Sequence, residues 1–180
     1  MGKGPLATKK HYQGQVAEAI AMNWMVAQGH KAQLSTDVLD QEKDIFVGDI
    51  RYEVKAQVPF MTRNRFGFSR DQEKKLKASN FILLISCPCS ETSHWTSGRL
   101  WLVDVRKMKD DDWILYETKS GVKMIGFHVG KNEEEKPEWI EPVYSLTEKE
   151  AKFLEDYNSS GWISNKEKFG NDYQTFRVYE

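Results

Sequence analysis

The chain has 180 residues, of which 39% are hydrophobic and 29% are charged, so its composition favours one folded domain and excludes wholesale disorder. Its 26 basic and 27 acidic side chains give a net charge of −1, so total charge does not indicate a nucleic-acid partner. No apolar run approaches the roughly 18–20 residues of a membrane span, and the first residues lack the apolar segment of a secretory signal. Two cysteines are too few for the disulfide framework of a small secreted protein. We therefore expect a cytoplasmic protein without a membrane partner.

The first part of the chain predicts an arm, a helix and a strand. Residues 1–12 are basic and contain glycine and proline, which favours a flexible arm ahead of the folded domain. In residues 13–28 apolar side chains recur at three- and four-residue steps, the period of an amphipathic helix. Gly29 suits the end of this helix, and residues 31–38 predict a first strand.

A β-hairpin follows. The segments 44–47 and 50–57 have the composition of strands, and Gly48-Asp49 between them suits a two-residue type II′ turn. This register places Asp44 opposite Glu53. Like charges at directly opposed positions destabilise a sheet by roughly 0.2–1 kcal/mol, so we expect a counter-charge beside them.

Side chains alternate between the two faces of the second hairpin strand. The apolar residues on one face can pack on the core, so the residues between them form a polar floor beside Asp44. This polar face comprises Arg51, Glu53, Lys55 and Gln57.

The remaining elements predict an α/β or α+β domain around a central mixed sheet. Their order is helix, three strands, helix and strand (αβββαβ), followed by C-terminal strands and a helix. Residues 60–69 and 87–99 are assigned to loops, and Thr147 with Glu150 fits a capping box. The expected elements are a helix at 70–78, strands at 81–86 and 100–105, an edge hairpin of 113–117 and 122–129, and a helix at 147–157.

Asp44 and Glu53 together predict a magnesium site. Mg²⁺ prefers oxygen ligands and is commonly held by one or two carboxylates plus waters and substrate phosphate. The metal would polarise a phosphoryl oxygen and acidify a water. Lys55, two residues along the same face, can orient or deprotonate that water or neutralise phosphate charge. Glu18 lies at the rim of the apolar stripe of the first helix, where we expect a third carboxylate, acting directly or through water.

These residues resemble the PD-(D/E)xK nuclease superfamily, which has the restriction-endonuclease-like fold. The matching pattern is a helical Glu18, then Asp44, then Glu53-x-Lys55 on the next strand. Gln57 extends the pattern to a form similar to RecB-like and resolvase-like members. Lys43 instead of proline precedes Asp44, which departs from the family pattern. The resemblance covers residues 13–105, whereas 106–180 form a C-terminal extension without a recognised match.

The resemblance implies a Mg²⁺-dependent phosphodiesterase acting on DNA, with Mn²⁺ as a substitute metal. It assigns Glu18, Asp44, Glu53, Lys55 and Gln57 to catalysis. It also implies that the backbone carbonyl of Val54 joins the carboxylates as a metal ligand.

A basic segment follows the hairpin and is interleaved with Phe66 and Phe68. Its position after the polar strand places it at the mouth of the expected cleft. Arginine and lysine contacts to phosphates supply the sequence-independent part of DNA affinity. The expected DNA-binding residues are Arg63, Arg65, Arg70, Lys74, Lys75 and Lys77, with Lys9 and Lys10 from the arm.

The sequence therefore predicts a metal-dependent deoxyribonuclease, an endonuclease formed by a single domain at 13–180. A homodimer is one arrangement that would reach both DNA strands. The alternative is a non-catalytic DNA-binding or assembly module that retains the nuclease fold. Glu-x-Lys by itself is more often a solvated strand face, and the surrounding hairpin and helix order favour the nuclease. Restriction, junction-resolving, repair and viral degradative roles all stay open.

Overall fold

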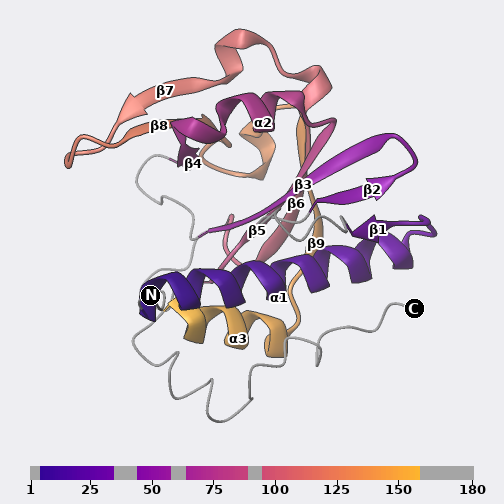
Figure 1. The fold of residues 1–180 in the computed structure, drawn as a ribbon. Coiled ribbons are helices and arrows are strands. Elements are labelled where there is room, and N and C mark those ends of the chain that lie inside the picture. The colour runs from indigo at the N-terminus through magenta and orange to yellow at the C-terminus, as the bar shows by residue number, and fades with distance from the viewer. Residues whose placement is uncertain (1–4, 35–43, 58–63, 89–94, 159–180) are drawn as a thin grey trace.

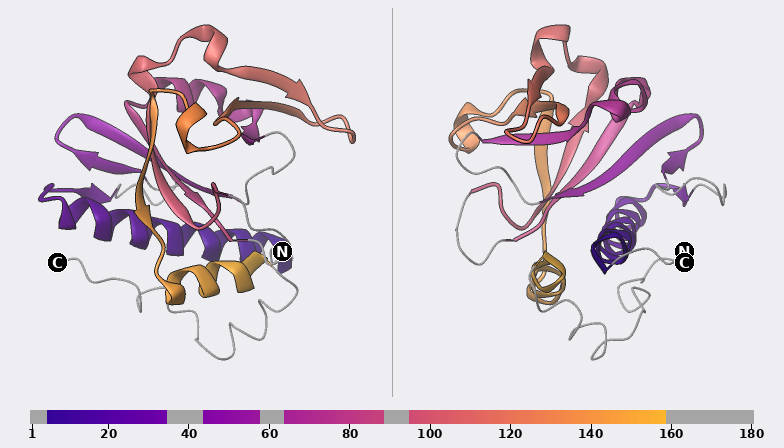
Figure 2. Two further views of the ribbon diagram at one scale, coloured as in Figure 1. Left: turned by 180° about the vertical axis from the view of Figure 1, so that it is seen from behind. Right: turned by 60° about the vertical axis from the view of Figure 1, so that its left-hand side comes forward.

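The computed structural model describes residues 5–34, 44–57, 64–88 and 95–158 (Figure 1). A larger sheet lies at the centre, with α1 (Pro5–Ala27) and α3 (Glu148–Asn158) on one face. The other face is covered by α2 (Glu73–Ala78) and a smaller sheet, as further views show (Figure 2). The protein is therefore an α+β domain, as predicted.

The larger sheet has six strands in the order β1-β2-β3-β5-β6-β9. β3 and β5 run parallel and every other neighbouring pair is antiparallel, so the sheet is mixed, as predicted. The parallel pair needs a crossover connection, and α2 lies within it. The strands are β1 (Gln33–Leu34), β2 (Ile45–Val47), β3 (Ile50–Gln57), β5 (Phe81–Ser86), β6 (Arg99–Asp104) and β9 (Ile140–Ser145).

The β2–β3 hairpin has the predicted register. Val47 pairs with Ile50 and Ile45 pairs with Tyr52, so Gly48 and Asp49 form the two-residue loop. Gly48 has a φ of +60°, whereas Asp49 is not among the residues with positive φ. A type II′ turn requires this combination, because only its first central residue has a positive φ.

Alternation along β3 divides its side chains between two cores. Tyr52 and Val54 pack with α1 in the first core, together with Leu83 of β5. The neighbouring residues of β5, including Ile82, belong to the second core, beneath the smaller sheet and Leu76 of α2. Since parallel neighbours share a face, the polar side chains of β3 point toward α2 and the smaller sheet.

The smaller sheet contains a strand that the sequence did not predict. Its order is β4-β8-β7, formed by β4 (Arg65–Ser69), β8 (Lys123–His128) and β7 (Ile114–Glu117). β7 and β8 are the predicted hairpin, but the assignment of 60–69 to a loop was wrong over β4. Two buried phenylalanines flank Gly67 there, and this short alternation was overlooked.

β9 was also not predicted. It contains Pro142, which lacks the backbone N–H that a central strand needs. The structure places β9 at the edge of the sheet, with a register shift in its partner between Leu100 and Trp101. Proline is tolerated at such an edge position, so tertiary placement overrides the local signal.

The three helices lie where the sequence predicts them, but α1 begins earlier and α2 begins at Glu73 rather than at residue 70. α1 begins at Pro5, so the helix includes residues that were expected to form the arm. At α3, Thr147 Oγ1 accepts from the backbone N–H of Glu150, and the Glu150 carboxylate accepts from the N–H of Thr147, which confirms the capping box. No helix in the described ranges combines the length and apolar content needed to cross a bilayer. Short 3₁₀ helices occupy Arg70–Gln72, Val105–Lys107, Asp110–Asp112 and Glu133–Glu135.

Gly126→Ala should destabilise the pairing of β4 with β8. A Cβ at this position would lie 2.1 Å from the carbonyl oxygen of Phe66, so the backbone would have to shift. We expect a loss of about 1–3 kcal/mol in the free energy of unfolding, measured by urea denaturation. Gly14→Ala is the control, because its Cβ would have no atom within 4 Å and alanine favours a helix by roughly 0.5–1 kcal/mol. An unchanged midpoint for G126A would contradict this packing.

Candidate functional site

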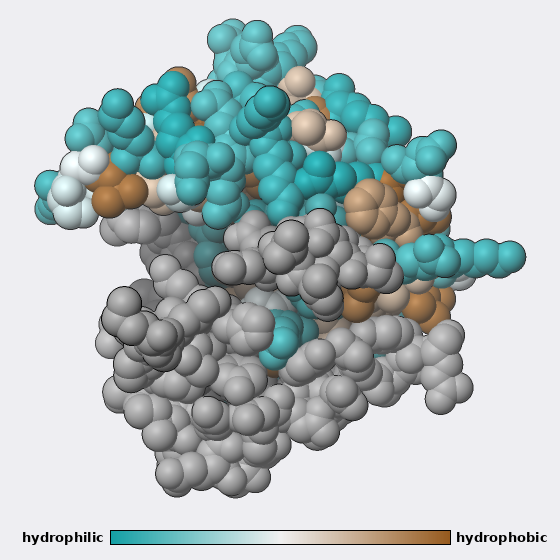
Figure 3. Space-filling view, viewed as in Figure 1, coloured by the Kyte–Doolittle hydropathy of each residue, from teal (hydrophilic) through white to brown (hydrophobic). Residues whose placement is uncertain are grey.

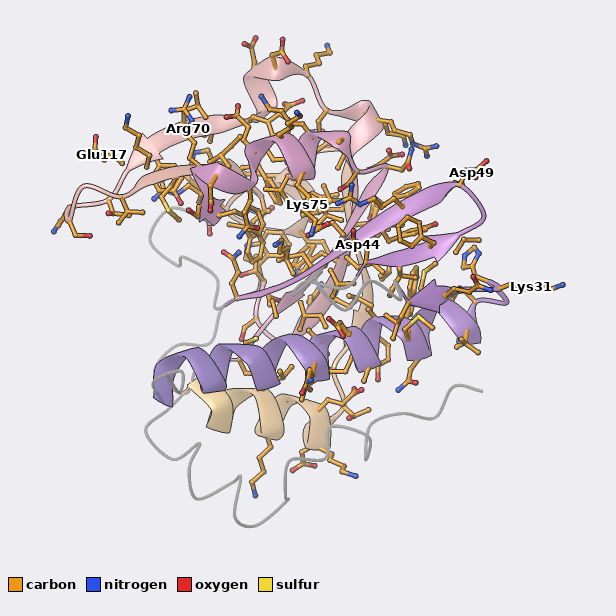
Figure 4. All side chains as sticks on the ribbon, viewed as in Figure 1. Lys31, Asp44, Asp49, Arg70, Lys75 and Glu117 are labelled. Atoms are coloured by element: carbon orange, nitrogen blue, oxygen red, sulfur yellow. The ribbon has the colours of Figure 1, made fainter. Side chains whose placement is uncertain are left out.

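Two buried carboxylates meet beside the β2–β3 hairpin. Asp44 directly precedes β2 and Glu53 lies on β3, with residue exposures of 3% and 0%. The hairpin pairs Ile45 with Tyr52, the residues next to the two acids, and both acids contact the same arginine, Arg51. Figure 4 shows Asp44 below α2, with Lys75 extending toward it from the helix. The predicted opposition of the two acids is therefore present.

Arg51 supplies the counter-charge that the pairing requires. Its Nε donates to Asp44 Oδ2 at 2.8 Å and its Nη2 donates to Glu53 Oε2 at 3.2 Å. The guanidinium thus bridges both carboxylates, using one oxygen of each. Sequence reasoning placed Arg51 on the polar face but did not assign it to the site. The signal was available, because residues two apart on a strand share a face.

Two lysines approach the same pair from different elements. Lys55 Nζ lies 3.4 Å from Glu53 Oε1 and donates a hydrogen bond to Gln72 Oε1, in the 3₁₀ turn before α2. Lys75 Nζ, from α2, lies 3.6 Å from Glu53 Oε1 and 4.0 Å from Asp44 Oδ1. Nothing in the sequence pattern identified Gln72, because its role depends on how the crossover folds back over β3.

One oxygen of each carboxylate lacks a hydrogen-bond donor. Asp44 Oδ1 and Glu53 Oε1 are buried and have no hydrogen-bond partner within the described part of the chain. Buried polar atoms are normally satisfied, so such oxygens mark a place where an additional group can bind. They are also the two oxygens that the Lys75 ammonium approaches.

The pKa of Glu53 is raised from 4.5 to about 7. Burial is the largest cause, because it disfavours the charged carboxylate, and the hydrogen bond with Asp44 adds to it. The charge of Lys55 acts in the opposite direction. Near neutral pH, a substantial fraction of the Glu53 carboxyl is therefore protonated.

This donor set fits a hard divalent cation. Two carboxylate oxygens without donors are the ligand type that Mg²⁺ prefers, and this ion keeps several waters when one or two carboxylates hold it. The described residues contain no cluster of three or more Asp, Glu, His or Cys side chains that could hold a metal. A protein-only cage is thus not formed there, and Asp44 and Glu53 would leave most coordination positions to water and substrate.

Glu18 does not join the pair. It lies on α1, which packs on the Tyr52 and Val54 side of β3, whereas Glu53 points to the other face. Its helical position at the rim of the apolar stripe was predicted, but sequence periodicity does not say which face of a sheet a helix covers. The side chain of Val54 likewise lies in the α1 core, and the role of its carbonyl stays a prediction.

Gln57 connects the two sheets. Its Oε1 accepts from the backbone N–H of Gly67, and its Nε2 donates to the Gly67 carbonyl, both at 3.0 Å. Because both ends of the amide are engaged by β4, the catalytic assignment of Gln57 does not fit its surroundings. Its contribution is to hold the smaller sheet over the polar face of β3.

The basic segment divides into several environments. Arg65 is 7% exposed and stacks over the Tyr116 ring at 3.6 Å, so the expected phosphate contact does not fit its buried position. Arg70 and Lys77 both pair with Glu73, and Lys74 is exposed. Lys75 enters the carboxylate site. Arg63 lies outside the described residues, as do the side chains of Lys9 and Lys10.

The surface above the site is polar. Viewed as in Figure 1, the part of the molecule that carries α2 and the 3₁₀ turns is mostly hydrophilic (Figure 3). A polar, partly basic surface is compatible with a nucleic-acid backbone.

Comparison with known proteins gives no relative: no family model, no curated protein and no solved structure matches this chain.

Glu53→Gln should remove a pH-dependent loss of stability. Glu53 titrates near 4.5 when unfolded and near 7 when folded, so the folded state binds more protons between these values. Stability from this group is complete below the lower value and is lost as pH rises through about 7. Glutamine does not titrate. In chelator, we expect the variant to gain about 2 °C or more in Tm relative to wild type between about pH 5 and about pH 8.5.

The control for this measurement is Glu117→Gln, which changes an exposed carboxylate on β7. Its Tm difference from wild type should stay constant across the same pH range. A constant difference for E53Q would mean that the carboxyl group is not perturbed by burial.

Proposed function

We propose that this protein is a Mg²⁺-dependent DNA nuclease with a restriction-endonuclease-like core. The observation that carries the proposal is the buried pair of carboxylates, each with one oxygen lacking a donor, beside the amine of Lys55. The order of α1, β1, β2, β3, α2 and β5 agrees with the αβββαβ pattern, with β4 added in the crossover.

Asp44 and Glu53 would hold the metal, which when bound would polarise a phosphoryl oxygen and lower the pKa of a water. Lys55 contributes from the protein side. Its Nζ lies 3.4 Å from Glu53 Oε1, so a water and a phosphate held at the carboxylates would lie near its positive charge. There it orients the water and stabilises the charge that develops as the phosphorus–oxygen bond breaks. The Gln72 amide holds this amine in place.

DNA is the proposed substrate because cations surround the site. Lys74 is exposed on α2, and Lys75 lies between that helix and the carboxylates. Neutralising phosphates with such side chains releases counterions, so binding should weaken as salt rises.

A non-catalytic DNA-binding module is the second candidate, and the bridge from Arg51 favours it. Arg51, Lys55 and Lys75 bring three positive groups to two carboxylates, so the pair is neutralised without a metal. Such a module would bind DNA equally well in chelator and would not cut it.

Lys55→Ala should slow DNA cleavage strongly, because it removes the amine beside Glu53. We expect wild type to nick or linearise supercoiled plasmid with Mg²⁺ or Mn²⁺, and K55A to be slower by at least about 100-fold, as for loss of a group acting in proton transfer or charge stabilisation. Electrophoresis of the plasmid over time measures this. Lys119→Ala is the control, because it removes an exposed lysine in the turn between β7 and β8 that has no part in the proposed site. Equal residual cutting by wild type and K55A would point to contamination.

Asp44→Asn should abolish stabilisation by divalent cations. A ligand that binds the folded state alone raises stability by mass action, so Mn²⁺ at about 100 times its Kd should add roughly 2.7 kcal/mol. We expect wild type to gain Tm with Mn²⁺ and Mg²⁺, and D44N to gain none, in thermal unfolding scans. Glu117→Gln should keep the gain. An undiminished gain in D44N would place the metal elsewhere.

A further inference from the structure

The side chain of Lys75 occupies the position where a divalent cation would bind. Its ammonium approaches Glu53 Oε1 at 3.6 Å and Asp44 Oδ1 at 4.0 Å, the two oxygens that lack hydrogen-bond donors. We propose that Lys75 is an intramolecular competitor for the metal, which must displace this ammonium to bind. This inference rests on the proposed function and adds a regulatory contact to the same site.

The division of oxygens among the cations supports the assignment. Arg51 uses Asp44 Oδ2 and Glu53 Oε2, so its bridge leaves the other oxygen of each acid available. Lys55 approaches one acid and is also held by the Gln72 amide. Lys75 approaches both acids through the remaining oxygens, which are the ones that a metal would share.

The backbone under Lys75 is fixed while its side chain can move. Leu76, the next residue, is fully buried in the second core. Ser79 Oγ donates to the carbonyl of Lys75 at 2.9 Å. Asn80 connects the end of the helix to Arg51, because its N–H donates to the Arg51 carbonyl and its Oδ1 accepts from the Arg51 N–H. The Lys75 side chain is 31% exposed, so it borders solvent, and we expect its ammonium to move toward that side without a movement of the helix.

Charge and distance make joint occupancy unfavourable. Mg²⁺ binds oxygen ligands at roughly 2.0–2.1 Å, which would place it against the ammonium at its present position. Two cations in a poorly solvated site repel strongly. The displaced ammonium would stay at the edge of the site, because the Lys75 backbone does not move. There it would form an ion pair with a phosphodiester of the substrate.

Removing the competing charge should tighten metal binding. We expect Lys75→Met to bind Mn²⁺ about tenfold more tightly than wild type, the change that a side-chain coupling of about 1.4 kcal/mol produces. The electron paramagnetic resonance signal of free Mn²⁺, titrated without DNA, measures this affinity. Lys75→Arg should keep the weak affinity, since it retains the charge. Lys74→Met controls for a general change in net charge, because it removes an exposed neighbouring lysine. Equal affinity in K75M and wild type would overturn the inference.

A second measurement uses the wild-type protein and does not depend on a variant that folds. Acetylation of lysines followed by mass spectrometry reports how accessible each ammonium is. Mn²⁺ should increase the labelling rate of Lys75 several-fold and leave the rate of Lys74 unchanged. A slower or unchanged rate for Lys75 in the presence of bound Mn²⁺ would contradict the displacement.

The outcomes separate this inference from the proposed function. If wild type binds Mn²⁺ through Asp44 but K75M binds no more tightly, the competitor role fails and the metal site stands. If neither protein binds Mn²⁺ and D44N behaves identically, both the metal site and the competitor role fail.

Discussion

The structure depends on compensating the charge of two neighbouring acids that are buried away from water. Asp44 and Glu53 lie at the end of the β2–β3 hairpin, both are buried, and Arg51 bridges them. Burial of like charges is unfavourable unless a proton or a cation compensates. The structure supplies both: a raised pKa at Glu53 and three positive side chains, two from β3 and one from α2.

The layer formed by the smaller sheet and α2 increases the need for a compensating charge at the two acids. The smaller sheet and α2 cover the face of β3 that carries the acids, and Gln57 fastens that cover through the backbone of Gly67. Excluding water from such a face strengthens every charge–charge interaction beneath it. A Cβ at Gly67 would lie 1.8 Å from the Tyr116 hydroxyl, so a larger residue there would require the Tyr116 ring to move. The packing of the smaller sheet on β3 therefore also strengthens the charge–charge interactions of the two acids.

Local rules predicted the hairpin and its acid pair, whereas long-range packing decided the rest. A two-residue glycine turn fixes register, and register with alternation places Asp44 beside Glu53. The same alternation places Arg51 on the face of Glu53, but the sequence analysis did not identify Arg51 as the partner of both acids. The positions of Glu18 and Arg65 depend on which face a helix covers and on where a strand docks. Local periodicity encodes neither of these. Glu18 therefore lies on a helix that packs on the other face of the sheet, and Arg65 is buried against Tyr116.

The crossover from β3 to β5 carries β4, the 3₁₀ turn and α2 in one continuous stretch. It therefore contributes Lys75 to the acids, Gln72 to Lys55 and Gly67 to the contact with the smaller sheet, while Asn80 at its end hydrogen-bonds to Arg51. Changes in this stretch would therefore alter the charge beside the two acids and the packing of the smaller sheet together, while leaving the β2–β3 hairpin in place.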